Sequence, residues 1–212
     1  MTERGMIFNS EMVRAILDGR KTQTRRPVKF PVLDKNLGCE LAGNELAGEL
    51  SAGNYLNSAF GKPGDRIWVR ETFCPVDDTQ YGGEKWVDYR ATPKFEASHP
   101  AGWDSAPNDA ESLKWRPSIH MPRWASRILL EITDVRVERL NAISEEDARA
   151  EGIIDGGCLN CGEPEPCGCA NPEPDATDAF AYLWQSIYGQ ENWNANPWVW
   201  VIEFKRVEGG AA

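Results

Sequence analysis

The longest strand pattern in the chain, SRILLEITDVRVERL at residues 126–140, most restricts the fold that the chain can adopt. Apolar residues alternate up to Leu130 and Ile132, as on a strand with one buried face. The alternation resumes at Val135 and Val137, one residue out of step, which predicts a bulge within one long strand. The fold is therefore expected to contain a sheet with this strand in it.

The stretch PWVWVIEFKRV, residues 197–207, predicts a second long strand near the C-terminus. Its nearly continuous apolar start is typical of a strand in the middle of a sheet. Shorter strands are predicted at residues 66–70 and 84–91. In the first of these, Ile67 and Val69 share one face, and a Pro-Gly turn comes before it.

Three helices are predicted from apolar spacing and capping residues. The first covers residues 10–18 and ends at Gly19, which can adopt the left-handed conformation. A short second helix begins after Ser144 and ends at Gly152, and a third covers about residues 175–188. Turns and long irregular loops join the strands, so we expect a mixed, mostly antiparallel sheet or small barrel with helices at its side, an α+β fold.

The chain has 212 residues and a formal net charge of −10, from 33 acidic and 23 basic residues. This length fits one domain, 1–212, with insertions at about 31–60 and 73–120 and a Cys-rich loop at 155–174. The negative charge argues against long-range attraction to a nucleic-acid backbone. Without a transmembrane run or a signal-peptide pattern, we expect a cytoplasmic protein with reduced thiols and no membrane partner.

The stretch RKTQTRRP, residues 20–27, concentrates basic side chains directly after the first predicted helix. Burial among other cations would lower the pKa of Lys21, because desolvation and like charge both disfavour the ammonium, and would make it a candidate base or nucleophile. On an extended chain Thr22 and Thr24 lie on the face opposite Lys21, whereas a turn would bring Lys21 and Thr24 together. The alternative interpretation is a solvated basic turn anchored by salt bridges.

The stretch CLNCGEPEPCGC gathers four thiols within residues 158–169. The four candidate ligands are Cys158, Cys161, Cys167 and Cys169. One interpretation is a tetrahedral zinc site, which would be structural because four thiolates leave no open coordination position. The other is a set of free or redox-active thiols in a loop rich in Pro, Glu and Gly.

The sequence ILDGRKTQTRR resembles the opening motif of the ASCH superfamily, in which a helix runs into G-[RK]-K-T-x-T-x-R at the mouth of a small β-barrel. PGDRIWVRE, ITDVRVERLNAISEEDARAEGI and WVIEFKRV resemble later segments of the family. The resemblance implies a PUA-like fold and a phage or prophage branch, hence a bacterial host cytoplasm. The similar segments are residues 6–30, 61–72, 125–153 and 178–207.

The resemblance also implies an activity, because one small bacterial member of the superfamily hydrolyses N(4)-acetylcytidine without a metal. Its catalytic lysine, threonine and glutamate correspond to Lys21, Thr24 and Glu151. Lys21 would then act as a base or activate a nucleophile, and Thr24 would be its hydroxyl partner. Glu151 would carry a proton to the departing amine. The implied substrate is an N-acylated pyrimidine nucleoside, and no cofactor is required for catalysis.

Two other functions fit the same sequence. The first is a non-catalytic module that binds a nucleotide or short RNA, with arginines on phosphate and a tryptophan stacked on a base. The second is a phage structural or accessory protein in which the barrel is only a scaffold. The residues expected around a ligand are Arg20, Thr22, Arg25, Arg26, Trp68, Glu71 and Trp124.

Overall fold

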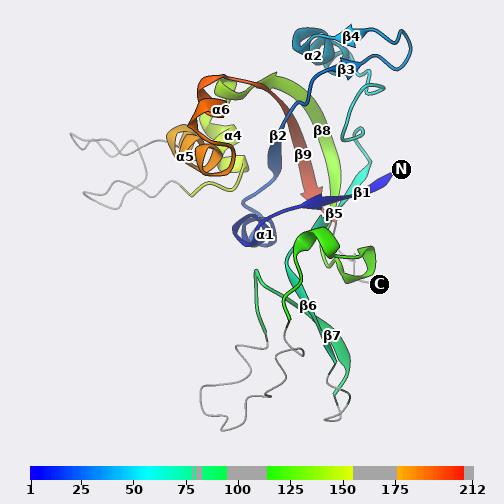
Figure 1. Cartoon of the computed structure of the whole chain (residues 1–212), viewed down its shortest axis with the longest axis vertical. Coiled ribbons are helices and arrows are strands. Elements are labelled where there is room, and N and C mark those ends of the chain that lie inside the picture. Colours follow the sequence, from blue (N-terminus) through cyan, green and yellow to red (C-terminus); the bar gives the residue numbers. More distant parts are fainter. Residues whose placement is uncertain (78, 80–82, 95–113, 155–175, 208–212) are drawn as a thin grey trace, which may run out of the picture. The chain divides into compact units, whose positions relative to one another are not determined.

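The computed structural model describes residues 1–77, 79, 83–94, 114–154 and 176–207 (Figure 1). The protein is of the mixed α+β class, as the sequence predicts. The described strands are β1 (Glu3–Ile7), β2 (Gln23–Pro27), β3 (Val32–Leu33), β4 (Glu40–Leu41), β5 (Arg66–Arg70), β6 (Phe73–Asp77), β7 (Lys85–Tyr89), β8 (Leu129–Arg139) and β9 (Trp198–Arg206). The described helices are α1 (Ser10–Leu17), α2 (Gly43–Ser51), α4 (Glu145–Ala150), α5 (Ala176–Tyr188) and α6 (Gln190–Asn194), with 3-10 turns η2 (Ser118–His120), η3 (Arg123–Ala125) and η4 (Leu140–Ala142).

Five strands form one mixed sheet in the order β1-β5-β8-β9-β2. The prediction that the C-terminal strand is central is confirmed, because β9 lies between β8 and β2. β2 and β9 are antiparallel, with Gln23 opposite Glu203 and Arg25 opposite Val201, whereas β1 and β5 are parallel. Among the described strands no closed barrel is found, and β1 and β2 stand at the two ends of the sheet order.

The long strand β8 changes its buried face along its length, as the sequence predicts. Ile132 is buried at an even position, whereas Val135 and Val137 are buried at odd positions. Arg136 and Glu138 alternate with these valines, so their side chains point to the opposite face of the strand. The change of face is therefore what presents two charged side chains together at the C-terminal end of β8.

The chain divides into two compact units. The first consists of the described parts of Met1–Thr2, Asp18–Asp65 and Glu131–Lys205, and the second consists of the described parts of Glu3–Leu17, Arg66–Leu130 and Arg206–Ala212. In the second unit, β6 and β7 form an antiparallel pair. Phe73, Met121 and Ala125 form a small apolar cluster there. None of the helices in the described part of the chain has both the length and the apolar character that a membrane crossing needs.

The main core of the first unit lies where the C-terminal helices meet β9. α4, α5 and α6 gather beside β2 and β9 in Figure 1. Phe180 and Trp184 of α5 belong to one buried cluster with Val199 and Val201 of β9, and the same cluster includes Ala148 of α4. Each buried side chain of this size stabilises the folded state by about 1.5–3 kcal/mol relative to exposure. This packing holds α4 against the sheet.

The region of the first predicted insertion is more ordered than the sequence analysis expects. β3 and β4 pair as a short antiparallel ladder, and α2 follows at Gly43–Ser51 with Leu46 and Leu50 buried. Strands of two residues are too short to show an alternating pattern, which is why the sequence does not reveal them. β1 also escapes prediction, since Met6 is its only buried residue.

We predict that two glycines of α2 respond to substitution with opposite signs. At Gly43 an added Cβ would clash with the indole ring of Trp198, so Gly43→Ala should destabilise the protein by about 1–3 kcal/mol through overpacking. At Gly48 no atom lies within 4 Å, so Gly48→Ala should stabilise the helix by up to about 1 kcal/mol. Urea unfolding of both variants measures the difference, and equal effects would contradict this account of the α2 packing.

Candidate functional site

The candidate site is built where the chain entering β2 runs beside the end of α4. Lys21 and Glu151 face each other in an isolated antiparallel bridge. The Thr22 amide donates to the carbonyl of Ala150 at 2.8 Å, and the Thr22 carbonyl accepts from the amide of Phe204, also at 2.8 Å. Backbone hydrogen bonds on both sides therefore fix the position of Lys21 before its side chain makes any contact.

The ammonium of Lys21 is buried against Glu151. Nζ donates to the carboxylate Oε2 at 2.7 Å and to the backbone carbonyl of the same residue at 2.8 Å. The side chains of Lys21 and Glu151 are 0% and 4% exposed. Burial lowers the pKa of Lys21, and repulsion from Arg26 and Arg25 adds to this, whereas attraction to Glu151 opposes it. The predicted lowering of the pKa of Lys21 is confirmed.

Arg25 occupies the centre of a charged cluster on the same face of the strand. Its Nη1 donates to Oε1 of Glu151 at 3.2 Å, so the two carboxylate oxygens of Glu151 bind different cations. Its Nη2 donates to Oε1 of Glu138 at 2.6 Å and to Oδ2 of Asp147 at 2.9 Å. The guanidinium also lies 5.7 Å from the ring centre of Phe180. Arg25 thus joins β2 to β8, α4 and α5.

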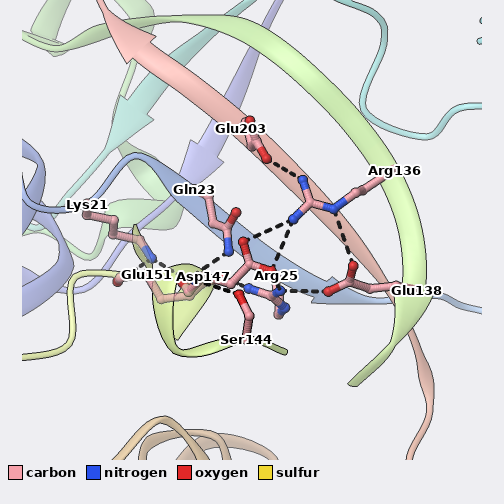
Figure 2. Close-up of polar contacts among 9 residues, drawn as sticks. All are labelled: Lys21, Gln23, Arg25, Arg136, Glu138, Ser144, Asp147, Glu151 and Glu203. Carbon is pink, nitrogen blue, oxygen red and sulfur yellow. Dashed lines mark hydrogen bonds and ion pairs between the residues drawn. The ribbon is translucent and has the colours of Figure 1, made fainter. Parts of the chain in front are cut away.

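Arg136 of β8 continues the cluster on the far side of Arg25 (Figure 2). Its Nε donates to Oε2 of Glu138 at 3.2 Å, and its Nη2 lies 3.2 Å from both carboxylate oxygens of Asp147. Its Nη1 pairs with Glu203 of β9. Burial alone would lower the pKa of Arg136, but the hydrogen bond to Glu203 and the charges of Glu138 and Asp147 raise it overall.

α4 is held in place by polar contacts at both of its ends. Ser144 caps the helix, with its Oγ accepting from the amide of Asp147 at 3.1 Å, as the capping pattern predicts. Gln23 Nε2 donates to the carbonyl of Asp147 at 3.1 Å. At the C-terminal end Gly152 adopts a φ of 90°, which a glycine tolerates without strain. The helix therefore presents Glu151 to Lys21 in a fixed position.

The structure brings together only part of the predicted catalytic set. Lys21 and Glu151 are in contact, whereas Thr24 is buried opposite Ile202 in the β2–β9 register. Since β2 is extended, Thr24 lies on the face opposite Lys21 and Arg25, the first of the two arrangements that the sequence allows. A contribution of Thr24 to the same chemistry stays a prediction.

Four of the predicted ligand-binding residues lie in the segment 20–26, which contains Lys21. Arg20 donates to the carbonyl of Gly152 at 3.0 Å and pairs with Asp18 at 3.2 Å, with its side chain 38% exposed. Thr22 is exposed, and Arg26 is partly buried. Arg25, in contrast, is surrounded by carboxylates of its own chain, which compensate its charge internally.

The other three predicted ligand-binding residues belong to the second unit. Glu71 is buried and accepts from Nε and Nη2 of Arg127 at 2.9 and 3.0 Å. The guanidinium of Arg70 lies 5.4 Å from the ring centre of Trp68. Trp124 is 71% exposed, so an aromatic face is open there.

The predicted zinc ligands Cys158, Cys161, Cys167 and Cys169 lie outside the described residues. Within the described ranges, no group of three or more His, Cys, Asp or Glu side chains is arranged to hold a metal ion. The structural zinc and its thiol alternative both stay predictions.

Sequence analysis missed most of the cluster around Arg25. The missed side chains are Gln23, Arg136, Glu138, Asp147 and Glu203. The sequence does contain a signal for this cluster, in the alternation of polar residues along two segments. Lys21, Gln23 and Arg25 occupy every second position along the segment that enters β2, and Arg136 and Glu138 alternate with buried valines of β8. Whether charged residues at such positions meet depends on the strand order, which these patterns do not reveal.

Comparison of the chain with protein-family models, with curated proteins and with solved structures found no match. The resemblance to the ASCH superfamily therefore stays a prediction based on the motifs quoted above. A buried ammonium and a carboxylate at 2.7 Å can exchange a proton directly, because the two atoms are already at hydrogen-bond distance.

We predict that Asp147 makes the stability of the protein sensitive to acid. Burial alone would raise the pKa of the Asp147 carboxyl, but Arg25 and Arg136 outweigh it and hold the pKa below its usual value of 3.8. A carboxyl with a lowered pKa stabilises the folded state above its unfolded pKa and loses that contribution as pH falls through its folded pKa. Asp147→Asn should therefore cost about 1.5–3 kcal/mol at pH 6, and the difference from wild type should shrink below about pH 4.

Urea unfolding between pH 6 and pH 2 measures this dependence on Asp147. Glu146→Gln is the matched control, because Glu146 is an exposed acid of the same helix. A difference between Asp147→Asn and wild type that stays constant down to pH 2 would show that the ion pairs of Asp147 do not stabilise the fold.

Proposed function

We propose that this chain hydrolyses the amide of a modified nucleoside, with Lys21 and Glu151 as the proton-transfer pair. The observation that carries the proposal is the buried contact of 2.7 Å between Nζ of Lys21 and Oε2 of Glu151. The pKa of Lys21 is lowered by its burial, which raises the fraction of neutral amine able to act as a base. Perturbed titratable groups of this kind concentrate at functional sites.

The proposed reaction uses the pair as a path for one proton. Neutral Lys21 accepts a proton from an attacking water while the water oxygen bonds to the amide carbon. The proton passes from Nζ to Oε2 of Glu151 along their hydrogen bond. Glu151 then protonates the nitrogen as its bond to the acyl carbon breaks. The products are a carboxylic acid and the free amine, and both side chains return to their starting states.

Substrate access is part of the proposal, because both side chains are almost completely buried in this conformation. Reaction requires an opening that exposes Nζ of Lys21. Thr22 and Arg20 are exposed neighbours of the pair in the sequence, and we assign them contacts with the polar groups of the nucleoside. Arg25 is assigned no substrate contact, since its donors Nη1 and Nη2 already bind carboxylates.

We further propose that the sheet belongs to a PUA-like barrel of the ASCH type and that the protein acts in a bacterial cytoplasm. The helix, glycine and Lys21 follow one another in the motif order, with α1 ending before Gly19 in a left-handed conformation. The long strand β8 leads through the short helix α4 to Glu151, also in the family order. These local arrangements support the proposed family.

The activity predicts that the purified protein converts N(4)-acetylcytidine to cytidine and acetate in equal amounts. Lys21→Met and Glu151→Gln should each lower kcat/KM by about 10²–10⁴-fold, the usual contribution of a general acid or base. Lys21→Met retains a long apolar stem in the buried position and removes only the amine. Product formation is measured by chromatography, and circular dichroism checks that each variant is folded.

Lys29→Met is the matched control for the loss of a lysine, because Lys29 is exposed and lies in the segment that follows β2. It should retain wild-type turnover. Full activity in a folded Lys21→Met variant would remove Lys21 from the mechanism. Absence of turnover by the wild-type protein on N(4)-acetylcytidine and on other N-acylated pyrimidine nucleosides would reject the proposed hydrolase.

A second candidate function is binding of a nucleotide without chemistry, and the exposure of Arg20 favours it. Its guanidinium is held at one side by Gly152 and Asp18, and its side chain is 38% exposed. An arginine oriented in this way can bind a phosphate group. Calorimetric titration with a cytidine nucleotide at low and high salt tests this function, since phosphate-driven affinity falls with salt. Affinity unchanged by salt and by Arg20→Gln would contradict it.

A further inference from the structure

The carboxylate of Glu151 is bound through both of its oxygens. Lys21 binds Oε2 at 2.7 Å, and Arg25 binds Oε1 at 3.2 Å (Figure 2). A carboxylate held through one oxygen can rotate about its terminal bond, whereas one held through both oxygens has a fixed plane. The second contact therefore decides the direction in which Oε2 points at Lys21.

Arg25 is itself held rigidly by groups that have no contact with Lys21. Nη2 binds Glu138 at 2.6 Å and Asp147 at 2.9 Å, and the side chain is 0% exposed. Arg136 bridges the same two acids from the other side. The two arginines and these two acids have charges that sum to zero, because two positive and two negative groups cancel. Arg25 therefore acts mainly by fixing the orientation of the Glu151 carboxylate. The effect of its charge on Lys21 depends on how far these acids compensate it.

We propose that Arg25 is the positioning residue of the Lys21–Glu151 pair, and that Glu138 and Asp147 hold it for this purpose. This inference rests on the proposed hydrolase for its kinetic consequence, although its structural consequence can be measured without turnover. Arg25 touches Glu151 and reaches the substrate only through it. The residue lies outside the lysine, threonine and glutamate set that the sequence resemblance implies.

The charge arrangement gives the proposal two predictions of opposite sign. Arg25→Gln removes a cation that repels the Lys21 ammonium and leaves Arg136 as the remaining shared partner of Glu138 and Asp147. The titration midpoint of Lys21 should then move to higher pH. Glu138→Gln removes a carboxylate and leaves the charge of Arg25 less compensated, so the same midpoint should move to lower pH.

The charged groups around Lys21 come from every element packed against it. Glu151 follows α4, Arg25 and Arg26 belong to β2, and Arg20 and Asp18 come before it. A second group of charged residues lies on the side of Arg25 away from Lys21. It consists of Asp147 of α4, Arg136 and Glu138 of β8, and Glu203 of β9. Each test variant changes one member of this set and leaves Lys21 and Glu151 in place.

The experiment is an NMR titration of the lysine Nζ and Cε resonances of the full chain, with Lys21 assigned by loss of its signal in Lys21→Arg. Wild type, Arg25→Gln, Arg25→Lys and Glu138→Gln are compared. Arg149→Gln is the control, because Arg149 is a half-exposed arginine that pairs with Glu145 on α4. Urea unfolding of each variant confirms a cooperative fold. We expect an upward shift in Arg25→Gln, partial return in Arg25→Lys, a downward shift in Glu138→Gln and no shift in the control.

Turnover of N(4)-acetylcytidine supplies the kinetic readout for Arg25. Arg25→Gln should lower kcat on the order of 100-fold with little change in KM, since misplacement of a reacting group acts on the chemical step. Its pH profile should shift upward with the Lys21 midpoint. Wild-type turnover with an unchanged profile in folded Arg25→Gln would overturn the inference.

The two readouts separate failure of the inference from failure of the proposed function. If the wild type hydrolyses no amide, the hydrolase is rejected, and the NMR shifts alone decide whether Arg25 governs the pair. A folded Arg25→Gln variant with an unchanged Lys21 midpoint assigns Arg25 a purely structural role. If Arg25→Gln does not fold, the sign of the shift in Glu138→Gln decides: a downward shift supports the inference, and an unchanged or raised midpoint overturns it.

Discussion

The ammonium of Lys21, buried with no exposed surface on its side chain, is the constraint on which the first unit depends. An isolated charge in such surroundings carries a desolvation penalty of several kcal/mol, so the fold must bring a carboxylate to it. Glu151 supplies this carboxylate from the position directly after α4, and the bridge between the two residues adds a backbone link. The place where β2 begins and the place where α4 ends are therefore set by one ion pair.

The sheet face beneath α4 changes from apolar to charged along β9. Val199 and Val201 pack against Phe180 and its neighbours, whereas Glu203, two residues further on the same face, binds Arg136. In the β2–β9 register Arg25 stands opposite Val201 and Gln23 stands opposite Glu203, so Arg25 lies where the apolar and charged parts of this face meet. The apolar part of this face holds the helices in place. Because the helices are fixed, the ion pairs of the charged part are ordered as well. A charged cluster of this size would otherwise cost side-chain entropy that surface ion pairs rarely recover.

The sequence predicts the elements of this site better than their contacts. Helix α1, strand β8 and the cap at Ser144 follow from local patterns, because periodicity and capping act within a few residues. Lys21 and Glu151 were grouped together only because the order of the motifs resembles that of a known family. The cluster around Arg25 could not be predicted, because it joins β2, β8, β9 and α4, whose neighbourhood depends on the strand order. Asp147 shows the limit plainly: the cap at Ser144, to which its amide donates, follows from a local pattern, whereas its ion pairs do not.

Stability alone is a weak explanation for the charged cluster. Replacement of a buried ionic network by apolar side chains of similar volume is often neutral or stabilising. Arg25 lies close to Phe180, in surroundings where an apolar residue could pack. The cluster therefore places an arginine and its acids beside an aromatic ring. What the arginine adds beyond packing is a second fixed contact on Glu151, and that contact is directional. Such direction matters for a carboxylate that must exchange a proton with Lys21, and it contributes little to one that only balances a charge.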